Sequence, residues 1–249
     1  MLWTRRRHVP GSGGLGDGVV CIPTTGALVL TGYAPTVTVA APTTIALVAH
    51  TTKQPGANGG ATDAIDTTGA TIVILVVSGY GPTASQTPTD SKSNTWTALT
   101  RKVQGNAGCQ IYYAVNPTVG SGHTFTYAAT DVYATIQVLA YSGVATSTPF
   151  DVENGATGAA VSTLATGSVT PAADNSLIVA GLCLDTTVTN MAINASFTLQ
   201  DGQAWSGGGA EAGYDADQIQ TTATARNPAW SWTTASVGAA AVIAVFKHS

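Results

Sequence analysis

The segment ATIVILVVS, residues 70–78, carries the strongest structural signal in the sequence. It is rich in Ile and Val, whose branched side chains pack well on the pleated surface of a β-sheet. Its apolar residues run on without polar ones between them, which indicates a strand buried on both faces. We therefore place this segment in the core of the fold.

Short strand patterns and turns alternate on both sides of this segment. No stretch repeats apolar residues at the helical period over three turns. Even the Ala-rich C-terminus favours a strand, because Val and Ile recur there and Gly238 precedes them. The sequence predicts an all-β fold, an antiparallel β-sandwich with a jelly-roll-like topology. Further strands are expected at residues 44–51, 95–100, 109–115, 123–128, 134–141, 168–170, 177–184, 197–201, 229–233 and 239–247.

The N-terminal part of the chain has a different character. Residues 1–25 are predicted to form a flexible arm, because they contain the Arg- and Gly-rich run RRRHVPGSGGLGDG. Residues 26–42 are predicted to form a β-hairpin or linker element, since two alternating runs flank the turn sequence GYAP. Residues 43–249 are then the β-sandwich domain.

The composition points away from several functional classes. Only 9% of the residues are charged, against about 25% in an average soluble chain. The net charge is −4 and the pI is about 5.3, so we expect no nucleic-acid partner, which would require a basic face. A surface of Thr, Ser, Asn and Gly is weakly hydrated and suits a protein that packs against copies of itself.

No motif in the sequence predicts a cofactor or insertion into a membrane. Cys21, Cys109 and Cys183 have no metal-site spacing and are expected to be buried free thiols. No phosphate-binding or dinucleotide-binding glycine motif occurs. We expect no signal peptide, because no apolar segment follows the basic N-terminus. The longest apolar runs fall well short of the ~20 residues that span a bilayer.

The pair Ser142-Gly143 at the end of a predicted strand has two interpretations. A serine beside a glycine at this place can be a nucleophile, but a nucleophile elbow has the pattern G-x-S-x-G and a following helix. The string here is AYSGV, and no helical pattern follows. A nucleophilic serine also needs a histidine base. The chain has few, and we favour a structural corner; the histidines are His8, His50, His123 and His248.

The carboxylates form local groups rather than a recognisable site. A glycosidase needs two carboxylates across a cleft, and calcium needs several oxygen ligands. Neither arrangement has a signature here, so we expect solvated loop carboxylates. The groups are Asp63 and Asp66, Asp151 and Glu153, and Glu211, Asp215 and Asp217.

Aromatic and basic residues supply the candidates for partner binding. Trp205 lies in the glycine-rich stretch DGQAWSGGG, and Trp205 and Tyr214 are the aromatic residues first in line to bind a glycan or receptor. Trp96, Trp230 and Trp232 lie in strand patterns and are expected in the core. In the arm, Trp3 and the basic run Arg5, Arg6 and Arg7 either form a solvated tail or dock on an acidic partner.

Several phrases together resemble a family of uncharacterised β-sandwich domains in tailed-phage virion proteins and bacterial surface proteins. Ser93 stands where that family usually has glycine, so this turn departs from the pattern. GALVLTGYAPTV also resembles a short element of structural proteins of tailed phages. The resemblance covers most of the chain and carries over no catalytic residue. The phrases are DSKSNTWTAL (90–99), QIYYAVNPTVGSGHTFTY (110–127), LAYSGVATSTPFD (139–151), TGSVTPAADNSLIVAG (166–181) and AAAVIAVFK (239–247).

The resemblance implies a non-enzymatic structural protein of a tailed-phage virion, assembled in the host cytoplasm. The expected role is an outer capsid decoration, head-fibre or tail-associated subunit, with other virion proteins and copies of itself as partners. The alternative is an adhesin-like module on a phage or bacterial surface that binds a host glycan or receptor. A depolymerase or other hydrolase is the third hypothesis, and the missing motifs count against it.

Overall fold

The chain is described from a computed structural model in residues 44–54, 60–81, 85–127, 133–204, 211–234 and 238–249. These residues belong to one compact unit, Ala41–Ser249. The predicted arm and hairpin, residues 1–42, lie outside the described residues. The described residues contain strands, turns and bridges but no helix, so the prediction of an all-β fold is confirmed.

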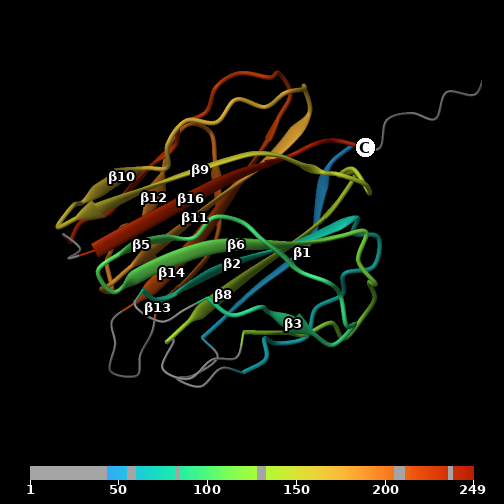
Figure 1. Ribbon diagram of the computed structural model, residues 1–249, viewed down its shortest axis with the longest axis horizontal. Helices are drawn as coiled ribbons and strands as arrows, with labels where there is room; N and C mark the ends of the chain where they lie inside the picture. Colours follow the sequence, from blue (N-terminus) through green and yellow to red (C-terminus); the bar gives the residue numbers. More distant parts are fainter. Residues whose placement is uncertain (1–43, 55–59, 82–84, 128–132, 205–210, 235–237) are drawn as a thin grey trace, which may run out of the picture. The chain divides into compact units, whose positions relative to one another are not determined.

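The first of two large sheets is built from the first half of the unit (Figure 1). Its strand order is β1-β8-β2-β6-β4, β5 pairs with β6, and every pairing is antiparallel. Its strands are β1 (Ala46–Lys53), β2 (Ile72–Tyr80), β4 (Thr97–Ala98), β5 (Lys102–Gln104), β6 (Ala107–Val115) and β8 (Thr135–Ser142).

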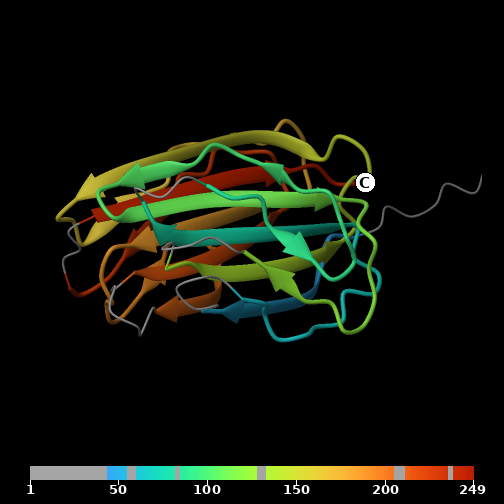
Figure 2. The same ribbon diagram turned by 60° about the horizontal axis from the view of Figure 1, so that its bottom comes forward.

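The second large sheet is built from the second half of the unit, with strand order β13-β14-β11-β16-β9. All of its pairings are antiparallel, and Figures 1 and 2 show the two sheets as stacked layers of a sandwich. Its strands are β9 (Phe150–Ala159), β11 (Ser176–Leu184), β13 (Thr198–Ala204), β14 (Ala212–Gln220) and β16 (Gly238–Phe246).

Two small sheets complete the strand inventory of the described residues. One pairs β3 (Thr89–Asp90) with β7 (Phe125–Thr126). The other has the order β10-β15-β12 and consists of β10 (Thr163–Ala165), β12 (Ala192–Ile193) and β15 (Ala229–Ser231). Each contributes to a cover on the outer face of one large sheet.

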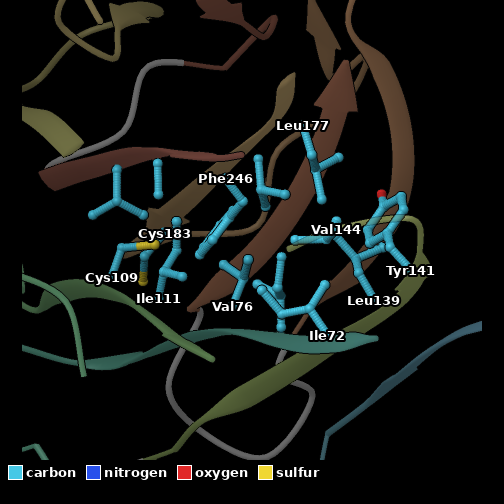
Figure 3. Close-up of a cluster of buried hydrophobic side chains, with 14 of the residues drawn as sticks. Ile72, Val76, Cys109, Ile111, Leu139, Tyr141, Val144, Leu177, Cys183 and Phe246 are labelled. Atoms are coloured by element: carbon cyan, nitrogen blue, oxygen red, sulfur yellow. The ribbon is translucent and has the colours of Figure 1, made fainter. Parts of the chain in front are cut away.

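The core lies in three layers. Between the sheets, Ile72, Ile74 and Val76 of β2 pack in one buried cluster with side chains of β11 and β16 (Figure 3). The alternate residues of β2 point outward and pack beneath Trp96, Phe125 and Tyr127. The expectation that this segment is buried on both faces is therefore confirmed. The outer face of the second sheet lies beneath Phe197, Trp230 and Trp232.

The structure corrects several expectations about individual strands. The sequence reasoning missed β9 and β14, which are long strands of the second sheet. Residues 168–170 were expected to form a strand, but only Val169 forms a bridge there, to Arg226. The jelly-roll topology is not confirmed, because the chain completes the first sheet before it begins the second.

The two large sheets have the same strand connectivity. In the first, the edge strand β1 pairs with the last strand, β8, which pairs with β2, which pairs with β6. In the second, the edge strand β9 pairs with the last strand, β16, which pairs with β11, which pairs with β14.

The pair Ser142-Gly143 forms a corner, as expected. β8 ends at Ser142, whose hydroxyl donates to the carbonyl oxygen of Ala46 at 3.4 Å. Gly143 has a φ of 73°, a left-handed conformation that glycine adopts without a steric cost.

Candidate functional site: an acidic seam between the sheets

Three carboxylates gather where the second sheet meets β1 and β8 of the first. Asp201 comes from β13, and Asp215 and Asp217 come from β14. Along β14, Ala212 and Ala216 pack outward into the cover of the second sheet, so Asp215 and Asp217 point inward. Together with His50, Tyr141 and Gln200, we call Asp201, Asp215 and Asp217 the acidic seam.

The expectation that these carboxylates are solvated in a loop is wrong. Asp215 is 0% exposed, Asp217 is 6% exposed and the preceding Glu211 is 4% exposed. The two aspartates alternate in β14 with Tyr214 and Ala216, which pack outward into the cover, so the other face of the strand buries the carboxylates.

Asp217 is held by donors from both sheets. The Tyr141 hydroxyl donates to its Oδ2 at 2.5 Å, and the Gln200 amide donates to its Oδ1 at 2.7 Å. Burial, followed by the charge of Asp217, raises the pKa of Tyr141 far above its usual range, so this hydroxyl keeps its proton. The Tyr141–Asp217 hydrogen bond therefore joins the sheets through their interior.

Asp215 is the most deeply buried carboxylate of the seam. Its Oδ1 accepts a hydrogen bond from the backbone amide of Asp201 at 2.8 Å, while its Oδ2 has no partner among the described protein groups. Burial, followed by the nearby charge of Asp201, raises its pKa well above the ordinary value. Asp215 therefore holds a proton to a higher pH than a solvated aspartate.

The outer side of the seam opens onto a groove of about 450 Å³. Nearby, His50 Nδ1 lies 2.9 Å from Asp201 Oδ2 and links β1 to β13. Hydroxyl and amide groups make the groove suited to hydrogen bonding with a polar ligand, and Asp217 is the one carboxylate among its described lining residues. The groove is lined by Leu47, Ser196, Thr198, Gln200, Asp217, Gln218 and Ile219.

This geometry does not provide the pair of open carboxylates that a glycosidase requires. Both oxygens of Asp217 already accept hydrogen bonds, and Asp215 is sealed from solvent. In the described part of the chain, no group of three or more His, Cys, Asp and Glu side chains is placed to hold a metal ion.

A second polar cluster lies under the cover of the first sheet. His123 Nε2 lies 3.0 Å from Asp90 Oδ1, and His123 Nδ1 lies 2.9 Å from Thr67 Oγ1. A hydroxyl, a histidine and an aspartate in series resemble a nucleophile, its base and an orienting acid. The side chains of Asp90 and His123 are 0% exposed, and so is Thr67, so no substrate reaches them.

The cluster instead holds a loop in place. Asp90 accepts hydrogen bonds from the backbone amide of Lys92 at 2.8 Å, the side chain of Asn94 at 3.1 Å and the indole of Trp96 at 2.9 Å. We call residues 90–96 the Asp90 loop. Its sequence DSKSNTW is one of the phrases that carry the family resemblance, and its carboxylate has a structural task.

The predicted partner-binding residues fall in different places. Trp3, Arg5, Arg6, Arg7 and Trp205 lie outside the described residues. Tyr214 lies in β14 and is half-buried, and its ring covers Gly202, where an added Cβ would come within 2.6 Å.

The described tryptophans and cysteines are all buried. Trp96, Trp230 and Trp232 are buried, as predicted. Cys109 and Cys183 are buried free thiols, also as predicted, and burial raises the pKa of Cys109 to about 12. The third cysteine, Cys21, lies outside the described residues.

The remaining carboxylate pairs do not form joint sites. Asp63 pairs with Lys53 at 2.9 Å, whereas Asp66 accepts hydrogen bonds from Thr68. Among the described residues, no helix is long and apolar enough to cross a membrane.

Comparisons with known proteins leave the family open. No family model matches the chain, and neither the curated proteins nor the solved structures give a significant match. The resemblance to phage and bacterial surface domains therefore stays a prediction.

Proposed function

We propose that this chain is a non-enzymatic structural protein of a tailed-phage virion. Its role is that of an outer capsid decoration, head-fibre or tail-associated subunit that binds neighbouring virion subunits. The use of its carboxylates, together with the sequence resemblance, supports this role.

The carboxylates serve as ties between segments of the sandwich. Asp90 holds its own loop, while Asp151 accepts from the backbone amide of Ala172 at 2.7 Å. Asp174 accepts from the amide of Ala223 at 2.7 Å, and Glu153 accepts from Thr100. The chain has few charged residues, and these carboxylates are bonded to its own backbone and side chains. This use supports a rigid structural role over catalysis, because a catalyst keeps charged groups free for its substrate.

The composition of purified particles tests this role. Particles from a culture that produces the chain are separated on a density gradient and examined by mass spectrometry. We expect the chain to co-sediment with the capsid or tail proteins in many copies. Its recovery solely from the soluble lysate or the cell envelope would contradict a virion role.

Light scattering of the purified full chain and of a variant lacking residues 1–18 tests how it assembles. If the sandwich makes the contacts between copies, the two proteins form the same oligomer. A full chain that assembles while the truncated one stays monomeric would assign those contacts to the arm.

The groove beside the acidic seam favours one alternative, a module that binds a glycan or host receptor. Thr198 and Gln200 offer a hydroxyl and an amide to a sugar there. A glycan array probed with the wild type and with Thr198→Val tests it. Binding that weakens in the variant supports this alternative, and an array without any binding contradicts it.

A further inference from the structure

We propose that the sandwich is an internal duplication. In this view the two large sheets, each with its cover, are two copies of one β unit. The inner face of each copy is then the docking surface for the other. The two sheets agree in their strand connectivity, in their strand registers and in their contacts across the core.

The shared connectivity extends to the small sheets that cover the outer faces of the two large sheets. In the first copy, β3 pairs with β7, and Ala61 bridges to Thr126 on the same segment. In the second copy, β12 and β10 pair with β15. Each outer face is thus covered by a late strand with two partners, and β7 corresponds to β15.

The three central strands of the two sheets correspond at nearly one offset along the chain. Ile72 faces Val115 on one side and Tyr141 on the other, and Leu177 faces Ile219 and Phe246 in the same way. The rows at the other end of these strands correspond in the same way. In all three strands, corresponding residues of the two sheets are separated by nearly the same number of residues along the chain. The second pair of rows is Ser78–Cys109–Thr135 and Cys183–Gly213–Ala240.

Contacts across the core are reciprocal under this correspondence. Tyr113 corresponds to Asp217, because they occupy the same row in their sheets, and Tyr141 corresponds to Phe246. The ring of Tyr113 contacts that of Phe246, with centroids 5.3 Å apart. The counterpart contact, Asp217 with Tyr141, is the hydrogen bond of the acidic seam.

The same exchange occurs near the centre of the core. Cys109 lies beside Cys183 (Figure 3). Their counterparts, Gly213 and Ser78, also meet, since a Cβ on Gly213 would lie 2.7 Å from the Cβ of Ser78.

The seams at the two edges of the sandwich correspond as well. His50 of β1 corresponds to Glu153 of β9, because they pair with corresponding residues of β8 and β16. His50 contacts Asp201 across one seam, and Glu153 accepts hydrogen bonds from Thr100 across the other. Thr100 follows Thr97 at the same spacing as Asp201 follows Thr198, and Thr97 and Thr198 pair with the counterparts Tyr113 and Asp217. A β-bulge between Leu199 and Asp201 shifts the pairing there by one residue.

Reciprocal contacts of this kind define a two-fold interface, in which residue i contacts j and the counterpart of j contacts the counterpart of i. Val76 and Gly181 mark its centre. They are counterparts of each other and they touch, since a Cβ on Gly181 would lie 2.5 Å from Val76 Cγ1. The sandwich therefore has the geometry of a homodimer joined into one chain.

The two copies diverge most at the acidic seam. Ile111 and Tyr113 of β6 are replaced by Asp215 and Asp217 of β14, and Ala107 is replaced by Glu211. The first copy shows that apolar side chains fill these places, so the fold itself does not require buried carboxylates there.

Exchanging a contact between the copies tests the duplication in the full chain. The double variant Tyr141→Phe/Asp217→Tyr copies the Phe246–Tyr113 contact to the acidic side. We expect each single variant to lower Tm and the double variant to recover at least about 3 °C over the less stable single. The control Tyr141→Phe/Asp215→Tyr carries the same side chains at a mismatched place and should melt at least about 5 °C below the matched double. Equal Tm values for the two doubles would overturn the proposal.

The exposed seam decides the question if Asp217→Tyr does not fold. His50→Glu alone places two carboxylates together and should lower Tm. His50→Glu/Asp201→Thr copies the Glu153–Thr100 contact and should melt about 2 °C above His50→Glu/Asp201→Ala, which removes the repulsion without supplying the hydroxyl. If the Thr and Ala variants melt together, the seams are not copies of one contact.

Discussion

At the residue scale, Ser93 has a backbone conformation that suits glycine better than serine. Its φ is 60°, in the left-handed region where a side chain is strained. The family that the sequence resembles usually has glycine at this place, which this left-handed conformation would suit. Ser93 therefore introduces local strain into the Asp90 loop, which is otherwise held by hydrogen bonds.

Replacing Ser93 with glycine should therefore stabilise the protein. We expect the free energy of unfolding to rise by about 0.5–1 kcal/mol, because the relief of strain exceeds the added freedom of the unfolded chain. Urea unfolding measures it. Ser91→Gly is the control and should destabilise, since Ser91 Oγ accepts from the amide of Thr124. A loss of stability in Ser93→Gly would show that the left-handed conformation is not strained.

Asp215 makes stability depend on pH in a specific direction. Its folded pKa lies above the value of 3.8 that it has in the unfolded chain, so the folded state binds its proton more tightly. The stabilisation is fully present below pH 3.8 and is lost as the pH rises toward the folded pKa, by about 1.4 kcal/mol per pH unit.

Asp215→Asn removes this titration and keeps the acceptor for the Asp201 amide. We expect the variant and the wild type to differ little below pH 3.8, and the variant to be clearly more stable at pH 8. Urea unfolding at both pH values measures the difference. A gap that stays constant between the two would mean that Asp215 is not the group responsible.

At the element scale, the Asp90 loop depends on one carboxylate. Asp90 gathers donors from Lys92, Asn94 and Trp96 and contacts the buried His123. Without it, several buried donors lose their partner at once, and each loss costs about 1–3 kcal/mol.

Asp90→Ala should free this loop before the sheets unfold. We expect trypsin to cut after Lys92 much faster than in the wild type, together with a loss of about 2–4 kcal/mol in stability. Mass spectrometry of timed digests locates the cut. Asp66→Ala, which removes an exposed acceptor of Thr68, serves as the control and should leave Lys92 protected. Equal cleavage in the two variants would show that Asp90 does not hold this loop in place.

At the scale of the whole molecule, a glycine sets the distance between the sheets. Gly181 of β11 meets Val76 of β2, and a Cβ there would also lie 3.0 Å from Val242 Cγ2. Interiors pack as densely as crystals, so an extra methyl group has to displace a sheet or a side chain.

Gly181→Ala should cost about 1–3 kcal/mol, and adding Val76→Ala should return part of that loss. Thermal unfolding of the two singles and the double measures the coupling. Purely additive effects would mean that the sheets do not meet at this pair.

Local pattern determined much of this protein on its own. The all-β class, the doubly buried strand at 70–78, the corner at Ser142-Gly143 and the buried tryptophans all follow from residue type and period. These features depend on side chains a few residues apart, which a sequence displays directly. The same reasoning missed β9, whose Gly, Asn and Ala lack a strand pattern, and β14, whose inward positions are aspartates.

Only the tertiary structure decided the acidic seam and the pairing of the halves. The sequence of β14 carries two aspartates among Ala, Gly, Tyr and Gln residues, and from the sequence these carboxylates were expected to be solvated. Asp217 can be buried because Tyr141 and Gln200 supply donors to its two oxygens, and the Asp201 amide supplies one to Asp215. A sequence lists donors and acceptors, but burial is a property of what packs on top of them, and that is fixed when the two sheets meet.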